Sequence, residues 1–219
     1  MTASDLISDL VSPAKTSDTG EELLTMMGVY HLRHLPIVNN KELLGVISED
    51  EILSQDVDAA VGSYPLSMRR PFVEMHTNII DMMRIMSEYN LTAIPVIDHN
   101  NVFTGMVLQE DIVKYFGQSA TFTQPGSVII VEVNRQDYSL HEITRIIEHE
   151  SAAIIGMLIF EHLNPNSIRV VLKLNTKNLK HILAGLQRYE YIVEASFSEY
   201  EVIDSFQDRY DSLMNYLDV

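Results

Sequence analysis

The sequence predicts an α+β fold with two parts, and three observations support this. Two segments of similar pattern, residues 21–53 and 80–113, follow one another in the first half of the chain. A stretch rich in small and polar residues follows at 117–126, with glycine at both ends. Beyond it, apolar strands and amphipathic helices alternate in the order β-α-β-β-α-β. With 219 residues, 46% of them hydrophobic, the chain has enough apolar material for two modest domains.

The composition excludes several classes of function. A formal net charge of −16 repels phosphate backbones, so we expect no nucleic-acid partner. No apolar run is long enough to cross a bilayer, and the N-terminal residues do not resemble a signal peptide, so we expect a cytoplasmic protein without membrane contact. The chain contains no cysteine, which rules out disulfides, thiolate nucleophiles and cysteine-ligated zinc.

Each repeat is predicted to run helix, strand, turn, strand, helix. Apolar residues at helical spacing open each copy, and a short apolar strand centred on Pro36 or Pro95 follows. Because proline lacks an N–H group, we place it at the start of a strand or on an edge strand. After a polar turn and a second strand, oxygen-bearing side chains such as Ser48 can start a helix. Neither repeat could bury both faces of so small a sheet alone, so we expect the two to pair.

The second half is predicted as a ferredoxin-like unit with a helical tail. Its helices have apolar residues on one face, and its strands are short apolar runs separated by turn residues. The last 21 residues place apolar side chains three or four positions apart, which predicts an amphipathic C-terminal helix. The predicted strands are 127–133, 152–160, 168–174 and 191–197, and the helices are 139–150, 178–188 and 199–219.

The repeats resemble CBS domains, whose second strand ends in a glycine-led motif that continues into a helix. The matching stretches are GVISEDEI at 45–52 and GMVLQEDI at 105–112. The resemblance implies a CBS pair over 1–118, with pseudo-twofold symmetry, β-α-β-β-α type repeats at about 1–56 and 66–118, and two clefts for adenine nucleotides. After a linker at 119–126, residues 127–198 look like an ACT domain. This domain order is similar to that of the acetoin-utilisation accessory (AcuB-like) family, whose members are regulators.

The resemblance also suggests which side chains hold a nucleotide. The family places a phosphate-binding Ser or Thr three residues before a ribose-binding Asp. Here Ser48 is followed by Glu51, whereas Asp111 follows Leu108, so each motif lacks one element. We rank Asp111 first; the alternative is that Ser48 and Asp111 only cap helices. The predicted nucleotide-binding residues are Asp111, Thr92, Ala93, Pro95, Ser48, Glu51, Arg33 and His34, of which Arg33 and His34 would assist with phosphate.

No catalytic or metal motif is expected. The sequence contains no Walker phosphate loop, Gly-x-Gly-x-x-Gly or Gly-x-Ser-x-Gly. His31 and His34 do not form a set of three ligands, and neither does His149 with its glutamate neighbours. The helix that begins His141-Glu142 has Arg145 where a zinc protease has its second histidine. We therefore expect neither an enzyme nor a metal protein.

Two functions remain open. The first is a regulatory or sensor module that binds AMP, ADP, ATP, S-adenosylmethionine, NAD or a related metabolite between the repeats and controls an unidentified enzyme. The second is a structural interaction protein with vestigial clefts. In either case we expect a homodimer or higher oligomer, because sheet edges and helical faces need cover. The turn at 134–140 lacks the glycine and proline usual in amino-acid-binding ACT domains, which favours dimerisation over amino-acid binding.

Overall fold

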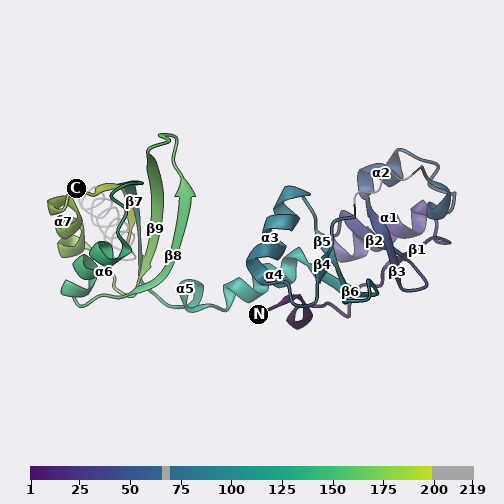
Figure 1. Cartoon of the computed structure of the whole chain (residues 1–219), viewed down its shortest axis with the longest axis horizontal. Coiled ribbons are helices and arrows are strands. Elements are labelled where there is room, and N and C mark those ends of the chain that lie inside the picture. The colour runs from purple at the N-terminus through teal and green to yellow at the C-terminus, as the bar shows by residue number, and fades with distance from the viewer. Residues whose placement is uncertain (66–69, 199–219) are drawn as a thin grey trace, which may run out of the picture. The chain divides into compact units, whose positions relative to one another are not determined.

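The computed structural model describes residues 1–65 and 70–198, and the chain divides into two compact units after Gly117 (Figure 1). Each unit has its own sheets and its own core. The α+β class is thereby confirmed. The predicted C-terminal helix, 199–219, lies outside the described residues.

The first repeat forms a three-stranded sheet in the order β1-β2-β3, with β1 parallel to β2 and β2 antiparallel to β3. The helix α1 begins where Thr19 and Glu22 form a capping box, in which each side chain accepts a hydrogen bond from the other residue's backbone N–H. It ends at His31, whose backbone is left-handed. The elements are β1 (Ala14–Lys15), α1 (Gly20–Tyr30), β2 (His34–Asn39), β3 (Glu42–Ser48) and α2 (Glu49–Leu53).

The second repeat repeats this topology, with sheet order β4-β5-β6. Even the irregularities correspond, because the register shifts after Ile37 in β2 and after Val96 in β5. This equivalence confirms the predicted pair of β-α-β-β-α repeats. The elements are β4 (Val73–Glu74), α3 (Ile79–Glu88), β5 (Ala93–Ile97), β6 (Phe103–Leu108) and α4 (Gln109–Gly117), with short 3-10 helices η1 (Ala3–Asp5) and η2 (Val61–Ser63).

The two repeats share their cores. Ala93, Met106 and Leu108 of the second repeat belong to the apolar cluster of the first. Ala3 and Val46 belong in turn to the cluster of the second repeat. Backbone hydrogen bonds also connect residues 2–8 with the second repeat. For example, the amide of Ser8 donates to the carbonyl of Met106 at 2.9 Å. Neither repeat therefore completes its core alone.

The prediction that the prolines lie at a strand start or on an edge strand was wrong, although its physical basis holds. Pro36 and Pro95 lie inside β2 and β5, the central strands of their sheets. Each short parallel neighbour pairs only beyond the proline: Ala14 of β1 lies opposite Ile37, the residue after Pro36. The missing N–H group thus falls where the central strand has a partner on one side only.

The second unit is a four-stranded antiparallel sheet in the order β10-β7-β9-β8, and both long helices cover the same face (Figure 1). This is the predicted ferredoxin-like order. Ile143 and Ile147 of α6 and Leu186 of α7 are fully buried against the strands. The elements are β7 (Ser127–Asn134), α6 (Leu140–His149), β8 (Ile154–Glu161), β9 (Ser167–Leu174), α7 (Lys180–Arg188) and β10 (Ile192–Phe197).

The stretch predicted as a linker contains structure of its own. A short helix, α5 (Ala120–Thr123), packs on β8, where the Thr121 hydroxyl donates a 2.8 Å hydrogen bond to the carbonyl of Ile155. Gly156 allows this approach, because a Cβ there would collide with Thr121. At the end of the stretch Gly126 has φ +158° and lies against the backbone of Leu174.

Replacing Gly126 with alanine should destabilise the second unit. The added Cβ would collide with the carbonyl oxygen of Leu174, a backbone atom inside the β7–β9 pairing, so the strand itself would have to shift. We expect a loss of a few kcal/mol, on the order of 1–3, in denaturant unfolding. Gly117→Ala is the matched control, because a Cβ there meets no atom within 4 Å. Equal stability of the two variants would contradict the packing described here.

Candidate functional site

A cavity of about 360 Å³ lies between the two repeats. The first repeat contributes His34 at the start of β2 and Val46, Ser48 and Glu51 around the junction of β3 and α2. The second repeat closes it with Pro71 and with the segment 88–91 at the end of α3. A hydroxyl, a carboxylate and an imidazole from one repeat thus face the other repeat across a hollow large enough for a small ligand.

Ser48 and Glu51 are bonded to each other. The Ser48 hydroxyl accepts a hydrogen bond from the Glu51 amide at 3.2 Å and donates one to the Glu51 carboxylate at 2.8 Å. The carboxylate also accepts the Ser48 amide at 2.7 Å. This capping box starts α2. The longer side chain of glutamate lets it turn back to Ser48, so the expectation that Ser48 caps a helix is confirmed.

Arg33 does not line the cavity. Its guanidinium contacts the carboxylates of Glu49 and Asp50 at 3.3 and 3.4 Å. Its backbone carbonyl accepts the amide of Glu49, and in the second repeat the carbonyl of Thr92 accepts the amide of Gln109 in the same way. Thr92 is therefore the pseudo-symmetric counterpart of Arg33.

His34 lies between the repeats. Its Nδ1 lies 3.4 Å from both the hydroxyl and the amide nitrogen of Thr92. Burial lowers the pKa of His34, and the neighbouring charge of Arg33 lowers it further, against weaker opposing effects of Glu51 and Asp50. The imidazole is accordingly neutral at pH 7 and acts as a polar group, not as a cation for phosphate.

Leu108 and Asp111, the motif residues of the second repeat, do not line this cavity. Leu108 is buried in the core of the first repeat, and Asp111 lies 3.7 Å from the ammonium of Lys114 on α4. Ala93 and Pro95 are buried in β5. Among the eight predicted residues, those that line the cavity are His34, Ser48 and Glu51.

Sequence reasoning missed the wall that the second repeat supplies. Pro71 and the segment 88–91 carry no motif of their own. A signal was nevertheless available, because a pseudo-twofold pair brings the helix end of one repeat next to the strand start of the other. Leu91 and Thr92 precede β5 just as Leu32 and Arg33 precede β2.

Two segments of the chain, residues 3–58 and 61–118, match the family model of the CBS domain. This chain belongs to the CBS-domain family. The cavity lined by Ser48 and Glu51 is therefore a cleft between paired CBS repeats.

The CBS pair is similar to several known proteins. An uncharacterised protein of Methanocaldococcus jannaschii, MJ0188, is 23% identical over 113 residues, which cover 51% of this chain and 42% of that protein. The chain thus matches less than half of the length of this relative. The crystal structure of a CBS domain pair/ACT domain protein, TM0892 of Thermotoga maritima, is 21% identical with a TM-score of 0.48, covering 53% of this chain and 96% of that one. The structure of CBSX2 in complex with AMP is 21% identical with a TM-score of 0.46 and the same coverages.

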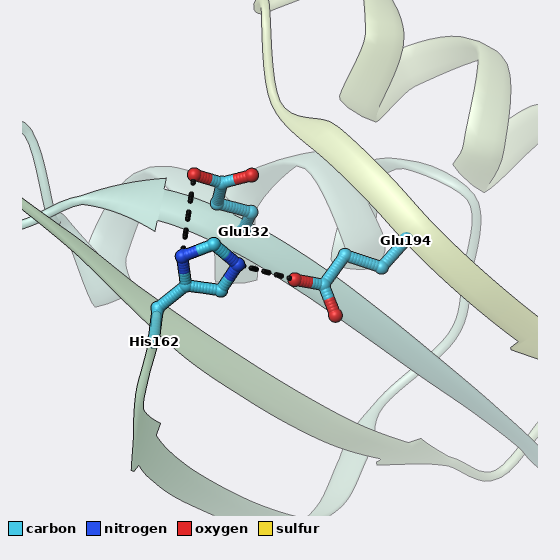
Figure 2. A group of neighbouring side chains, drawn as sticks. All are labelled: Glu132, His162 and Glu194. Carbon is cyan, nitrogen blue, oxygen red and sulfur yellow. Dashed lines mark ion pairs between the residues drawn. The ribbon is translucent and has the colours of Figure 1, made fainter. Parts of the chain in front are cut away.

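A second polar group lies on the sheet of the other unit, formed by Glu132, His162 and Glu194 (Figure 2). One ligating atom of each lies within 4.8 Å of the others, a spacing that a metal ion could bridge. The amide of Asn164 donates a 3.0 Å hydrogen bond to His162 Nδ1, which leaves the ring proton on Nε2, 3.2 Å from Glu194.

Glu194 is in turn held by Arg169, whose hydrogen bonds lower the pKa of this carboxyl group. A metal ion at Nε2 would need the proton on Nδ1, opposite the Asn164 amide. The group is therefore best explained as a set of polar contacts across β7, β10 and the end of β8, with Glu194 3.2 Å from Nε2 and Glu132 3.8 Å from Nδ1. Within the described residues, no helix is both long and apolar enough to cross a membrane.

The lowered pKa of His34 predicts a pH-dependent stability. As the pH falls below the ordinary histidine value, the unfolded chain takes up a proton that the folded protein still rejects, so folding stability falls. Between about pH 7.5 and about pH 5.5 we expect the melting temperature of the wild type to drop more than that of His34→Gln. His99→Gln, on an exposed turn, should keep the wild-type pH dependence. Identical pH profiles for wild type and His34→Gln would refute this assignment.

Proposed function

We propose that this protein is a regulatory module whose CBS cleft binds an adenine nucleotide, or a related small metabolite, and controls a partner enzyme. CBS-domain proteins are commonly regulatory and bind nucleotides such as AMP or ATP. The observation that carries the proposal is the cavity of about 360 Å³ in which Ser48, Glu51 and His34 converge. The hydroxyl could meet a phosphate, the carboxylate two ribose hydroxyls and the apolar wall an adenine ring.

The charges around the cleft favour a ligand with few phosphates. Glu51 and Glu88 line it, and His34 is neutral at pH 7. Arg33, which the sequence suggested as a phosphate partner, is turned toward Glu49 and Asp50. Each added phosphate would enter the field of a chain with a formal charge of −16. Among AMP, ADP, ATP, S-adenosylmethionine and NAD, we therefore propose AMP-like or cationic adenosyl ligands as the preferred class.

Binding would have to compete with the capping box. The Glu51 carboxylate already accepts hydrogen bonds from the amide and the hydroxyl of Ser48. Ribose hydroxyls would have to replace these bonds. This competition lowers the net gain on binding and is the observation that supports the alternative, an interaction protein with a vestigial cleft. The second motif keeps its acid, Asp111, but has Leu108 in place of the hydroxyl.

A bound ligand could control a partner enzyme because both repeats line the cavity. A ligand that contacts His34 and Leu91 touches both repeats and favours whichever arrangement of the pair holds it best. We infer transmission through a homodimer in the cytoplasm, and the domain order suggests membership of the acetoin-utilisation accessory family. CBS-pair proteins are generally regulatory rather than catalytic, which fits the absence of catalytic motifs from the sequence.

Calorimetry on three proteins tests the site. We expect AMP or S-adenosylmethionine to bind the wild type, and Glu51→Ala to weaken binding about tenfold to a hundredfold, because the ribose loses a charge-assisted acceptor. Asp111→Ala removes the same chemical group from the other motif. Weakening by Asp111→Ala alone would move the site to the second cleft. No heat with any adenine ligand would leave only the structural alternative.

A homodimer or higher oligomer is the second expectation. β8 is an edge strand, and Leu158 and Phe160 on it are about half exposed, at 55% and 50%. Exposed apolar side chains on an edge strand invite pairing with another copy. Light scattering at micromolar concentration should give at least twice the chain mass of 24.9 kDa. Leu158→Lys together with Phe160→Lys should lower that mass if this edge forms the interface, and a monomeric wild type would remove the claim.

A further inference from the structure

We propose that the groove between α6 and α7 binds a small multivalent oxyanion, such as a phosphate compound or a di- or tricarboxylate. The groove, a hollow of about 240 Å³, lies on the helical face of the second unit. It is lined by Arg145 and His149 of α6, by His181, Gly185 and Arg188 of α7, and by Tyr189. It is independent of the CBS cleft.

The two arginines of this groove differ from most others in the chain. Arg33, Arg84, Arg135 and Arg169 each contact a carboxylate. Arg145 and Arg188 form no ion pair with any residue that the structure describes, although acidic residues outnumber lysine and arginine by 31 to 15. Two guanidinium groups that form no ion pair with a described residue therefore line one hollow, where the nearest acidic side chain among the lining residues is Glu150.

Helix dipoles do not account for this placement. Arg188 and His149 lie in the last turns of their helices, where a cation is favourable. Arg145, however, lies in the middle of α6, and His181 is the second residue of α7, where an acid would be preferred. Basic side chains therefore gather here from several positions along the two helices, and not only from their last turns.

The packing of the helices keeps the groove open and its walls in place. Gly185 and Ala184 leave the α7 wall without a long side chain, and a Cβ at Gly185 would come within 2.9 Å of Ile146. Arg145 lies over the ring of Tyr189, with its guanidinium carbon 5.3 Å from the ring centroid. This stacking orients a planar fork whose donors match two oxygens of a phosphate or carboxylate.

The volume and the charge limit the ligand. A hollow of about 240 Å³ is smaller than the roughly 300 Å³ at which pockets for drug-sized ligands begin, so a nucleotide is too large to be enclosed. Glu150 also lines the hollow, with its carboxylate 3.2 Å from His149 Nδ1, so one acidic group stands beside the two guanidiniums. Two guanidiniums together match an anion with two or more charges better than a single carboxylate.

Isothermal calorimetry on the full chain, with pyrophosphate and citrate as probes at constant ionic strength, tests the proposal. We expect at least one probe to bind, and Arg145→Gln and Arg188→Gln each to weaken it about tenfold or more. Binding of pyrophosphate alone would identify a phosphate site, and binding of citrate alone a carboxylate site. Arg84→Gln is the matched control, because it changes the net charge equally but lies on α3.

Ala184→Glu provides a second variant that leaves both arginines intact. Ala184 is exposed on the wall of the groove, and glutamate favours a helix, so the protein should fold while an internal carboxylate occupies the site. We expect it to abolish binding. Equal affinity in wild type, Arg145→Gln and Ala184→Glu would overturn the proposal, as would equal weakening by Arg84→Gln or no binding of either probe at millimolar concentration.

Discussion

The exchange of residues between the two repeats is the constraint on which the first unit depends. Each three-stranded sheet is too small to bury both its faces, and each borrows side chains from the other: Ala93 and Leu108 in one direction, Val46 in the other. Backbone pairing adds to this, since the amide of Phe103 bonds to the carbonyl of Lys41 at 2.8 Å. The cleft exists because of this exchange, since its walls come from both repeats.

The fold was largely predictable because its signals are local. Helical spacing of apolar residues, turn residues and a recurring motif predicted the order of the main helices and strands of each repeat, and located the strands and long helices of the second unit within about two residues. The short strands β1 and β4 and the helix α5 were not predicted. Errors arose where a neighbour distant in sequence decides the outcome. Pro36 lies inside a central strand because the two-residue partner β1 starts pairing one residue later, and no local pattern encodes that offset.

The site was predictable only in part, for the same reason. The motif identified Ser48 and Glu51, and both line the cavity. It could not indicate that they bond to each other, that Arg33 turns to Glu49, or that Tyr89 and Asn90 form the opposite wall. Arg33 contacts Glu49 and Asp50 because acidic side chains are abundant in this chain and attract its guanidinium. Where arginines have no acidic partner among the described residues, as with Arg145 and Arg188, the tertiary fold has brought them together from separate helices.

The capping box of Ser48 and Glu51 gives the cleft a built-in link to a secondary-structure element. α2 is only five residues long, so its stability rests on its first turn more than that of a long helix would. Any molecule that draws the Glu51 carboxylate into the cleft frees the Ser48 amide, and a molecule that presents its own acceptor to this amide replaces the lost hydrogen bond. The ordering of α2 is thereby coupled to what occupies the cleft, because the same side chains cap the helix and line the cavity.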